Sequence, residues 1–96
     1  MSKKLFIKHF PSRMTLDERQ QFLHSFGALK VQCFPDNGKM VTKYSCFATF
    51  YDEQSATNAM HKLHQLNLFG FRLSVEYAND DKLIANEYDI VCGPSL

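Results

Sequence analysis

The stretch KYSCFATF, from Lys43 to Phe50, constrains the fold most strongly because its side chains alternate in character with a period of two. Such alternation is typical of a β-strand with one face in the core and the other in solvent. The predicted core face consists of Tyr44, Cys46, Ala48 and Phe50. The opposite face places the ring of Phe47 between the hydroxyl groups of Ser45 and Thr49. The stretch therefore predicts a half-buried strand whose open face presents a large aromatic ring.

Two segments with helical periodicity lie on either side of this strand. The first begins at a capping box, TLDE at residues 15–18, and ends at Gly27. The second runs from about Asp52 to Leu66, and its acidic start suits the positive end of a helix dipole. Its apolar stripe consists of Ala56, Ala59, Met60, Leu63 and Leu66. The sequence thus predicts two helices that each bury one face.

Three further stretches have strand character: residues 5–7, 29–34 and 72–77. The turn sequence PDNGK at residues 35–39 predicts a hairpin between the second of them and the Lys43–Phe50 strand. Residues 67–70 are predicted to form a loop before the last strand.

The resulting order, β-α-β-β-α-β, predicts an α+β fold, a ferredoxin-like sandwich in which two helices cover one face of a four-stranded antiparallel sheet. Leu5 and Ile7 would point to the helices, and Phe6 would lie with Phe47 on the uncovered face. Exposed rings on such a face are a platform on which unstacked bases can lie.

Composition limits the class of protein. The 96 residues suit one domain, and 45% hydrophobic with 22% charged residues is globular. Residues 1–50 carry eight Lys/Arg and three Asp/Glu, whereas residues 51–96 carry three and seven, so the halves hold +5 and −4. The three cysteines show no C-x-x-C spacing, which argues against a disulfide scaffold or zinc site. We interpret Cys33 and Cys46 as small buried hydrophobes, which suits a reducing compartment. No membrane span or signal peptide is predicted.

Two motifs resemble those of the RNA recognition motif family. LFIKHF at residues 5–10 looks like the RNP2 strand motif, and residues 43–50 look like RNP1, in the same order. The resemblance implies a recognition-motif domain over residues 1–79 that binds single-stranded RNA without catalysis, with Phe6 and Phe47 as stacking rings and Lys43 as a phosphate contact. The sequence departs from RNP1 at Ser45, where the family commonly has a third aromatic.

Strand parity adds further candidates for the RNA surface. The cations predicted to face the open side are Lys4, Lys8, Lys30, Lys43 and Arg72. Base preference is expected to be set at the end of the last strand, by Glu76, Tyr77 and Asn79. The carboxylate of Glu76 can accept hydrogen bonds from a base amino group. The rings are expected either to be open to RNA or to be covered by another part of the chain or by a protein.

A narrower resemblance concerns CFATF together with KLHQLNLFGFRLSVEYA. These runs are similar to the N-terminal recognition motif of the 65-kilodalton subunit family of the minor spliceosome's di-snRNP. That resemblance implies a nuclear splicing protein. In that family a second, C-terminal motif binds the snRNA, and the N-terminal part is linked to a partner protein of the particle. The expected partners here are single-stranded RNA, with snRNA as one candidate, and spliceosomal snRNP proteins. An alternative is a protein–protein adaptor with little RNA affinity, which Ser45 and the near-neutral charge favour.

Residues 80–96 are predicted to be a C-terminal tail, either a frayed end or a short amphipathic helix with Leu83, Ile84 and Tyr88 as contacts to a partner or to the sheet. His61 and His64 have a spacing that could hold a metal, but no third ligand accompanies them, so no metal site is predicted. No catalytic arrangement or phosphate-binding loop is readable, so neither an enzyme, a cofactor nor a small-molecule substrate is expected.

Overall fold

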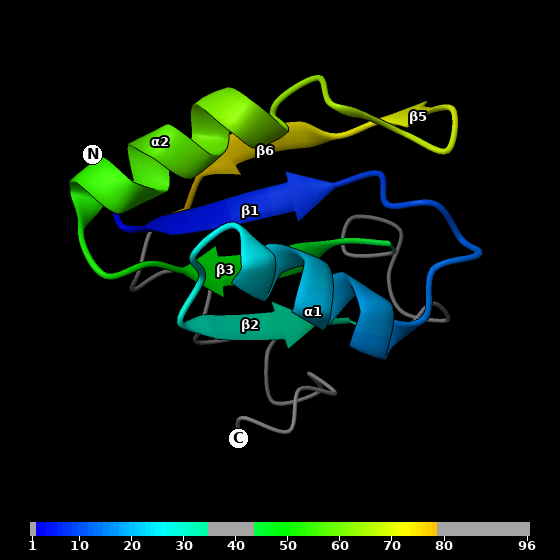
Figure 1. The fold of residues 1–96 in the computed structure, drawn as a ribbon, viewed down its shortest axis with the longest axis horizontal. Helices are drawn as coiled ribbons and strands as arrows, with labels where there is room; N and C mark the ends of the chain where they lie inside the picture. Colours follow the sequence, from blue (N-terminus) through cyan, green and yellow to red (C-terminus); the bar gives the residue numbers. More distant parts are fainter. Residues whose placement is uncertain (1, 35–43, 79–96) are drawn as a thin grey trace.

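The computed structural model describes residues 2–34 and 44–78. Their elements are β1 (Lys4–Lys8), α1 (Leu16–Ser25), β2 (Lys30–Cys33), β3 (Cys46–Thr49), α2 (Glu53–Leu63), β4 (Asn67–Leu68), β5 (Phe71–Arg72) and β6 (Ser74–Tyr77). Four strands form one antiparallel sheet in the order β2-β3-β1-β6, and both helices lie on the same side of it (Figure 1). The predicted ferredoxin-like α+β sandwich is confirmed.

Both helices begin where their N-cap residues predict. Thr15 and Glu18 form the reciprocal capping box: the Glu18 N–H donates to Thr15 Oγ1 at 3.0 Å, and the Thr15 N–H donates to Glu18 Oε1 at 2.9 Å. Asp52 caps α2 by accepting the Ser55 N–H at 2.8 Å. This second helix ends at Leu63, three residues before the predicted end at Leu66.

The core fills the space between the sheet and the helices. Its fully buried members include Leu5 and Ile7 from β1, Leu23 from α1 and Leu63 from α2, which confirms the parity expected for β1. Arg19 of α1 is also fully buried. Its Nη2 donates to the carbonyl oxygens of Met14 at 2.7 Å and Pro11 at 3.5 Å and so anchors the segment between β1 and α1.

The prediction of a loop at residues 67–70, followed by a strand from Arg72, is wrong. Residues 67–72 form a separate small hairpin, β4–β5, in which Asn67 pairs with Arg72. Phe69 and Gly70 at its tip have φ angles of 54° and 88°, as a two-residue type I′ turn requires. The sheet strand β6 then begins at Ser74.

Some predictions fall outside the described residues. These are the turn at residues 35–39, the positions of Lys43 and Asn79, and the tail with Leu83, Ile84 and Tyr88. The domain boundary at residue 79 stays a prediction. Among the helices of the part that is described, none is long and apolar enough to cross a membrane.

Candidate nucleic-acid interface

Two phenyl rings face each other across the middle of the sheet. Phe6 of β1 lies directly opposite Phe47 of β3 in the strand register. Their ring centroids are 4.5 Å apart with an interplanar angle of 20°, which is a stacked arrangement. Because Leu5 and Ile7 enter the core on the helix side, this pair lies on the face without helices.

A third ring, which the sequence interpretation did not assign to this face, belongs to Phe34 at the end of β2. It meets the Phe47 ring edge-on, with centroids 5.7 Å apart and an interplanar angle of 75°. Phe6, Phe34 and Phe47 are called the ring cluster below. The signal for Phe34 was present in the sequence: Val31 and Cys33 point inward, so alternation places Phe34 outward.

Ser45 explains where the ring of Phe34 finds room. The Phe34 N–H donates to the Ser45 carbonyl at 3.4 Å, and Cys33 is paired with Cys46, so Phe34 and Ser45 are opposite each other. Side chains opposite each other on one face have Cβ atoms about 4.5–5.5 Å apart. An aromatic at position 45 would therefore compete with the Phe34 ring for the same space. We infer that the ring of Phe34, the residue that follows β2, occupies space that an RNP1 aromatic at position 45 would need.

The ring of Phe47 is covered, which is one of the two states expected from the sequence. Its exposed fraction is 2%, and that of Phe34 is also 2%, whereas Phe6 is half-buried. The described neighbours of the Phe47 ring are Phe6, Phe34 and the ammonium group of Lys4, whose Nζ lies 5.6 Å from the ring centroid. In this state a base can reach Phe6 without rearrangement, but it can reach the face of Phe47 only if neighbouring side chains move.

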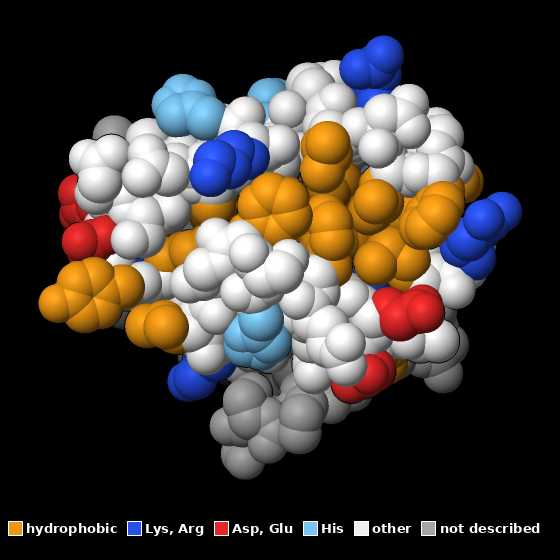
Figure 2. All heavy atoms as spheres, viewed as in Figure 1, with side chains coloured by type: hydrophobic (Ala, Val, Ile, Leu, Met, Phe, Trp, Pro, Cys, Tyr) orange, Lys and Arg blue, Asp and Glu red, His pale blue; other side chains and the backbone are white. Residues whose placement is uncertain are grey.

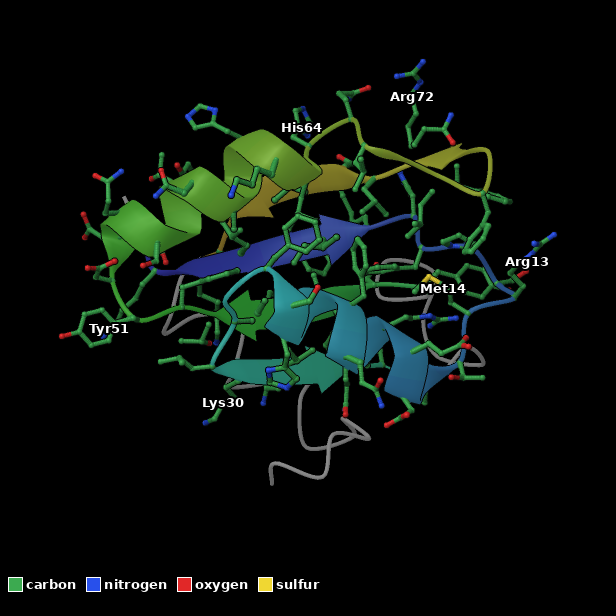
Figure 3. All side chains as sticks on the ribbon, in the orientation of Figure 1. Arg13, Met14, Lys30, Tyr51, His64 and Arg72 are labelled. Carbon is green, nitrogen blue, oxygen red and sulfur yellow. The ribbon has the colours of Figure 1, made fainter. Side chains whose placement is uncertain are left out.

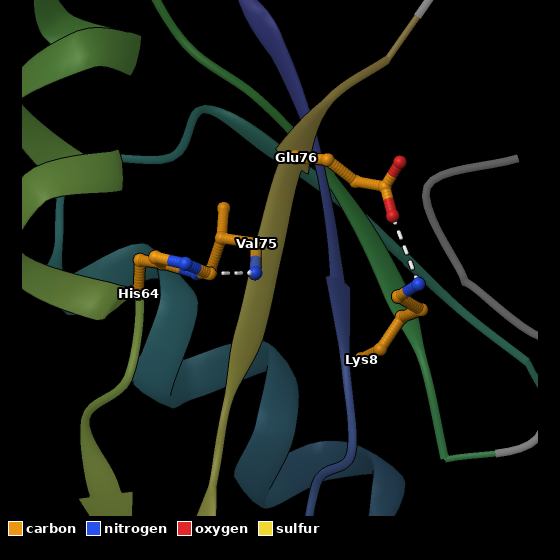
Figure 4. A network of polar contacts seen from close by, with 4 residues as sticks. All are labelled: Lys8, His64, Val75 and Glu76. Carbon is orange, nitrogen blue, oxygen red and sulfur yellow. Dashed lines mark hydrogen bonds and ion pairs between the residues drawn. The ribbon is translucent and has the colours of Figure 1, made fainter.

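Lys8 and Glu76 lie on the same face, as predicted, but they are paired with each other. Lys8 Nζ is 2.8 Å from Glu76 Oε2 and 5.8 Å from the Phe6 ring centroid (Figure 4). Both side chains retain solvent contact, with exposed fractions of 29% and 56%. An ion pair at this exposure exchanges readily, so both groups stay available to a ligand.

The cations of β1 and β2 differ in accessibility. Lys4 is 5% exposed and lies against the ring cluster. Lys30 opens β2 at the sheet edge and is exposed (Figure 3). Lys4 and Lys8 thus lie against rings of the cluster, whereas Lys30 lies opposite Thr49.

Arg72 and Tyr77 do not join this surface, contrary to prediction. Arg72 belongs to the β4–β5 hairpin and points away from the four-stranded sheet, and its Nη1 donates to the Gln65 carbonyl at 3.5 Å (Figure 3). The side chain of Tyr77 lies on the helix side, because it is opposite Leu5, and its hydroxyl is 3.0 Å from Thr57 Oγ1 of α2. Alternation along β6 brings Glu76, not Tyr77, to the open face.

The helix side of β6 carries a different polar contact. The Val75 N–H donates to His64 Nδ1 at 3.1 Å, on the opposite side of the sheet from the Lys8–Glu76 pair (Figure 4). His64 therefore tethers the end of α2 to an edge strand. Within residues 2–34 and 44–78, no three His, Cys, Asp or Glu side chains form a cluster that could hold a metal ion.

Comparisons with known proteins agree with this geometry. The family model of the RNA recognition motif matches residues 5–74, and the chain belongs to this family. It is 42% identical to RNA-binding region-containing protein 3 of Danio rerio over 79 residues, which are 82% of this chain and 15% of that protein. It is 33% identical to multiple RNA-binding domain-containing protein 1 of Saccharomyces cerevisiae over 86 residues, which are 90% of this chain and 10% of that one.

Solved structures show the same fold. The RRM of Rna15 with bound RNA superimposes with a TM-score of 0.67 at 21% identity, covering 84% of this chain and 88% of that one. The Sxl-lethal protein in its RNA complex gives a TM-score of 0.63 at 20% identity, covering 82% of this chain and 48% of that one. The chain spans about one seventh of the length of its Danio rerio relative.

Proposed function

We propose that this domain binds single-stranded RNA on its helix-free sheet face and serves in pre-mRNA splicing without catalysis. The observation that carries the proposal is the stacked pair of Phe6 and Phe47 across β1 and β3, with lysines at its margin. Aromatic rings on a sheet offer stacking surfaces to bases, and the lysines supply charge for the phosphates.

Each residue of the surface has a distinct part in this proposal. A base stacks on the half-buried ring of Phe6. Lys8 and Lys30 contact phosphates, and Glu76 accepts from a base amino group when its ion pair with Lys8 opens. Lys43 keeps the phosphate contact that the family resemblance implies, and Asn79 keeps its expected part in base preference.

The buried ring of Phe47 sets a condition on tight binding. A second base would stack only after the Phe34 or Lys4 side chain moves away from that ring. Movement of Phe34 breaks an aromatic contact worth about 0.5–1.5 kcal/mol, and movement of Lys4 breaks a cation–π contact, so part of the stacking free energy is spent on rearrangement. Binding of low to moderate affinity follows.

The particular setting proposed is a minor-spliceosome snRNP in the nucleus. The runs CFATF and KLHQLNLFGFRLSVEYA support it by their similarity to the corresponding di-snRNP subunit family, and so does the identity to RNA-binding region-containing protein 3. The partners proposed are single-stranded RNA, including snRNA, and other snRNP proteins.

Titration with short single-stranded RNA tests the RNA-binding proposal. The isotope-labelled domain receives a pool of random-sequence RNAs while backbone amide shifts are followed by NMR, and affinity is measured by fluorescence anisotropy. Amides of β1 and β3 around Phe6 and Phe47 are expected to move. Phe6→Ala is expected to weaken binding about tenfold or more, since stacking is worth roughly 1–3 kcal/mol per base.

Phe69→Ala is the matched control, because this exposed ring lies in the β4–β5 hairpin and away from the sheet face. It should leave RNA affinity unchanged. The proposal is refuted if no amide of β1 or β3 shifts at millimolar RNA, or if Phe69→Ala weakens binding as much as Phe6→Ala does.

A protein-adaptor function is the second candidate, and the helix side favours it. Phe69 and Phe71 are 59% and 50% exposed. Figure 2 shows hydrophobic side chains gathered on this side of the molecule. A pocket of about 490 Å³ lies between α1 and the hairpin and is lined by Arg13, Met14, Glu18, Gln21, Phe22, Leu68 and Phe69. The proposed occupant is a protein of the same snRNP.

The two variants used above separate the functions. If the helix side docks a protein, Phe69→Ala should reduce capture of snRNP proteins from nuclear extract, while Phe6→Ala should leave that capture intact. The reverse pattern, with capture lost only in Phe6→Ala, would place the interaction on the sheet face and remove the adaptor proposal.

A further inference from the structure

Two thiols face each other across neighbouring strands in the core. Cys33 of β2 and Cys46 of β3 are paired directly in the register, and both are fully buried. Their sulfur atoms are 2.7 Å apart. A disulfide bond is about 2.04 Å long, so the sulfurs need to approach by less than about 1 Å to become bonded.

The backbone places these two residues at the closest type of cross-strand position. The hydrogen bond from the Phe34 N–H to the Ser45 carbonyl joins the residue after Cys33 to the residue before Cys46. That pattern makes Cys33 and Cys46 a non-hydrogen-bonded pair, in which Cα atoms lie about 4.5 Å apart. Disulfides span Cα separations of roughly 4.4–6.8 Å, so the strands already hold the pair within range.

We propose that Cys33 and Cys46 are a redox modification site that forms a reversible cross-strand disulfide with hydrogen peroxide. One cysteine thiolate attacks a peroxide oxygen, which gives a sulfenic acid and releases hydroxide. The second thiol attacks the sulfenic sulfur, forms the S–S bond and releases water. In total, two thiols give up two electrons and two hydrogens, and one peroxide becomes two waters. A dithiol reverses the reaction by exchange.

Access to the sulfurs comes through the edge of the sheet. Among the strands that the structure describes, β2 is an edge strand of four residues, bonded to β3 on one side. Short edge elements open locally at lower free energy than a central strand does. Peroxide is close to water in size, so a brief separation of β2 admits it, and closure then brings the sulfenic acid against its partner thiol.

This site does not depend on the RNA-binding proposal. It extends the interpretation of Cys33 and Cys46 as buried small hydrophobes, because burial in the reduced state and pairing in the oxidised state use the same geometry. In a reducing compartment, disulfides are transient and serve redox sensing, which suits a bond that forms only under peroxide.

Peptide mapping tests the proposal in a Cys92→Ser chain, which removes the third cysteine. The native protein is treated with hydrogen peroxide and then unfolded in the presence of iodoacetamide, which blocks the remaining thiols. It is then digested with trypsin without reductant. Cleavage after Lys30, Lys39, Lys43 and Lys62 separates Cys33, in residues 31–39, from Cys46, in residues 44–62. Mass spectrometry is expected to find these two peptides linked and to find them separate again after dithiothreitol.

A control digestion uses protein held in guanidinium chloride during oxidation. The proposal is overturned if the link forms only in the unfolded chain, or if the native protein gives separately alkylated or over-oxidised peptides. Stability supplies a second readout. The linked form should unfold at a higher urea concentration than the reduced form, and Cys33→Ala in the same background should show no such shift on oxidation. An unchanged midpoint for the linked form would also contradict the proposal.

Discussion

At the scale of single residues, the position of a side chain on its strand determines which groups reach the surface. Alternation correctly placed Phe6, Phe47, Lys8 and Glu76 on one face. It could not reveal that the Phe47 ring is buried, because burial depends on the side chains packed over it and not on strand parity. Phe34 followed the same rule and was missed because it stands at the end of β2, next to a predicted turn.

Exchanging Phe34 and Ser45 tests whether one ring occupies the space shared by the two positions. Ser45→Phe alone should lower the free energy of unfolding by about 1–3 kcal/mol, because it forces a second ring into a filled space. The double variant Phe34→Ser, Ser45→Phe should recover a large part of that loss. Urea unfolding measures both. If the double variant is as unstable as the sum of its single changes, the two positions do not share space.

Asp52 provides a prediction about pH. The backbone N–H of Ser55, and then its side chain, donate to the Asp52 carboxylate and lower its pKa. A lowered pKa in the folded state means that the charged form stabilises the fold. This contribution is present above the ordinary pKa of aspartate and is lost as the pH falls through the lowered value.

Asp52→Asn should therefore weaken the dependence of the free energy of unfolding on pH in the acidic range. The amide oxygen of the new side chain still caps α2. NMR titration of the Asp52 carboxyl, with urea unfolding at several acidic pH values, measures both effects. An ordinary pKa for this carboxyl would contradict the hydrogen-bond assignment.

At the scale of elements, signals that act within a few residues were reliable. The capping box at residues 15–18 and the acidic N-cap of α2 began their helices where expected. The β4–β5 hairpin was missed because its turn, Phe69–Gly70, lacks the Asn-Gly or Asp-Gly dipeptide by which such turns are recognised. The sheet strand predicted to begin at Arg72 therefore begins at Ser74, and Arg72, an expected phosphate contact, belongs to the hairpin instead of the four-stranded sheet.

Gly70 tests the cause of this hairpin. A Cβ at this position meets no atom within 4 Å, so Gly70→Ala introduces backbone strain without a clash. We expect it to reduce the free energy of unfolding by about 1–2 kcal/mol, the cost of left-handed backbone for an ordinary residue. Gly70→Asn should cost less, because asparagine visits that region more readily. Thermal unfolding compares them, and equal losses would argue against the φ angle as the cause.

At the scale of the whole molecule, charge is distributed unevenly although the net charge is only +1. The described sheet face holds Lys4 and Lys8 against rings of the cluster, and Lys30 at the edge of the sheet opposite Thr49. The three phosphate contacts proposed above, by Lys8, Lys30 and Lys43, would make the logarithm of the binding constant fall with the logarithm of salt concentration with a slope of about −2, since each contact contributes roughly 0.7. Glu76 reduces the charge that RNA meets by pairing with Lys8.

Glu76→Gln should therefore tighten binding to an RNA pool at low salt and make the salt dependence steeper. Glu53→Gln, an equal change of charge at the start of α2, is the control and should have a smaller effect, because α2 lies on the other side of the sheet. Anisotropy titrations at several salt concentrations give the slopes. Equal effects of the two variants would show that total charge, and not this ion pair, governs affinity.

The pairing of β1 with β6 has a mechanical consequence. Leu5 near the start of β1 lies opposite Tyr77 at the end of β6, and the pairing ends with Lys8 opposite Ser74. Tension applied through residues 2 and 78 would act on one end of this ladder, so its hydrogen bonds would open one after another instead of resisting together. Because β1 also carries Phe6, pulling at these two points would dismantle the stacked pair at an early stage of unravelling. Separating these two points would therefore need less force than sliding the two strands past each other along their length.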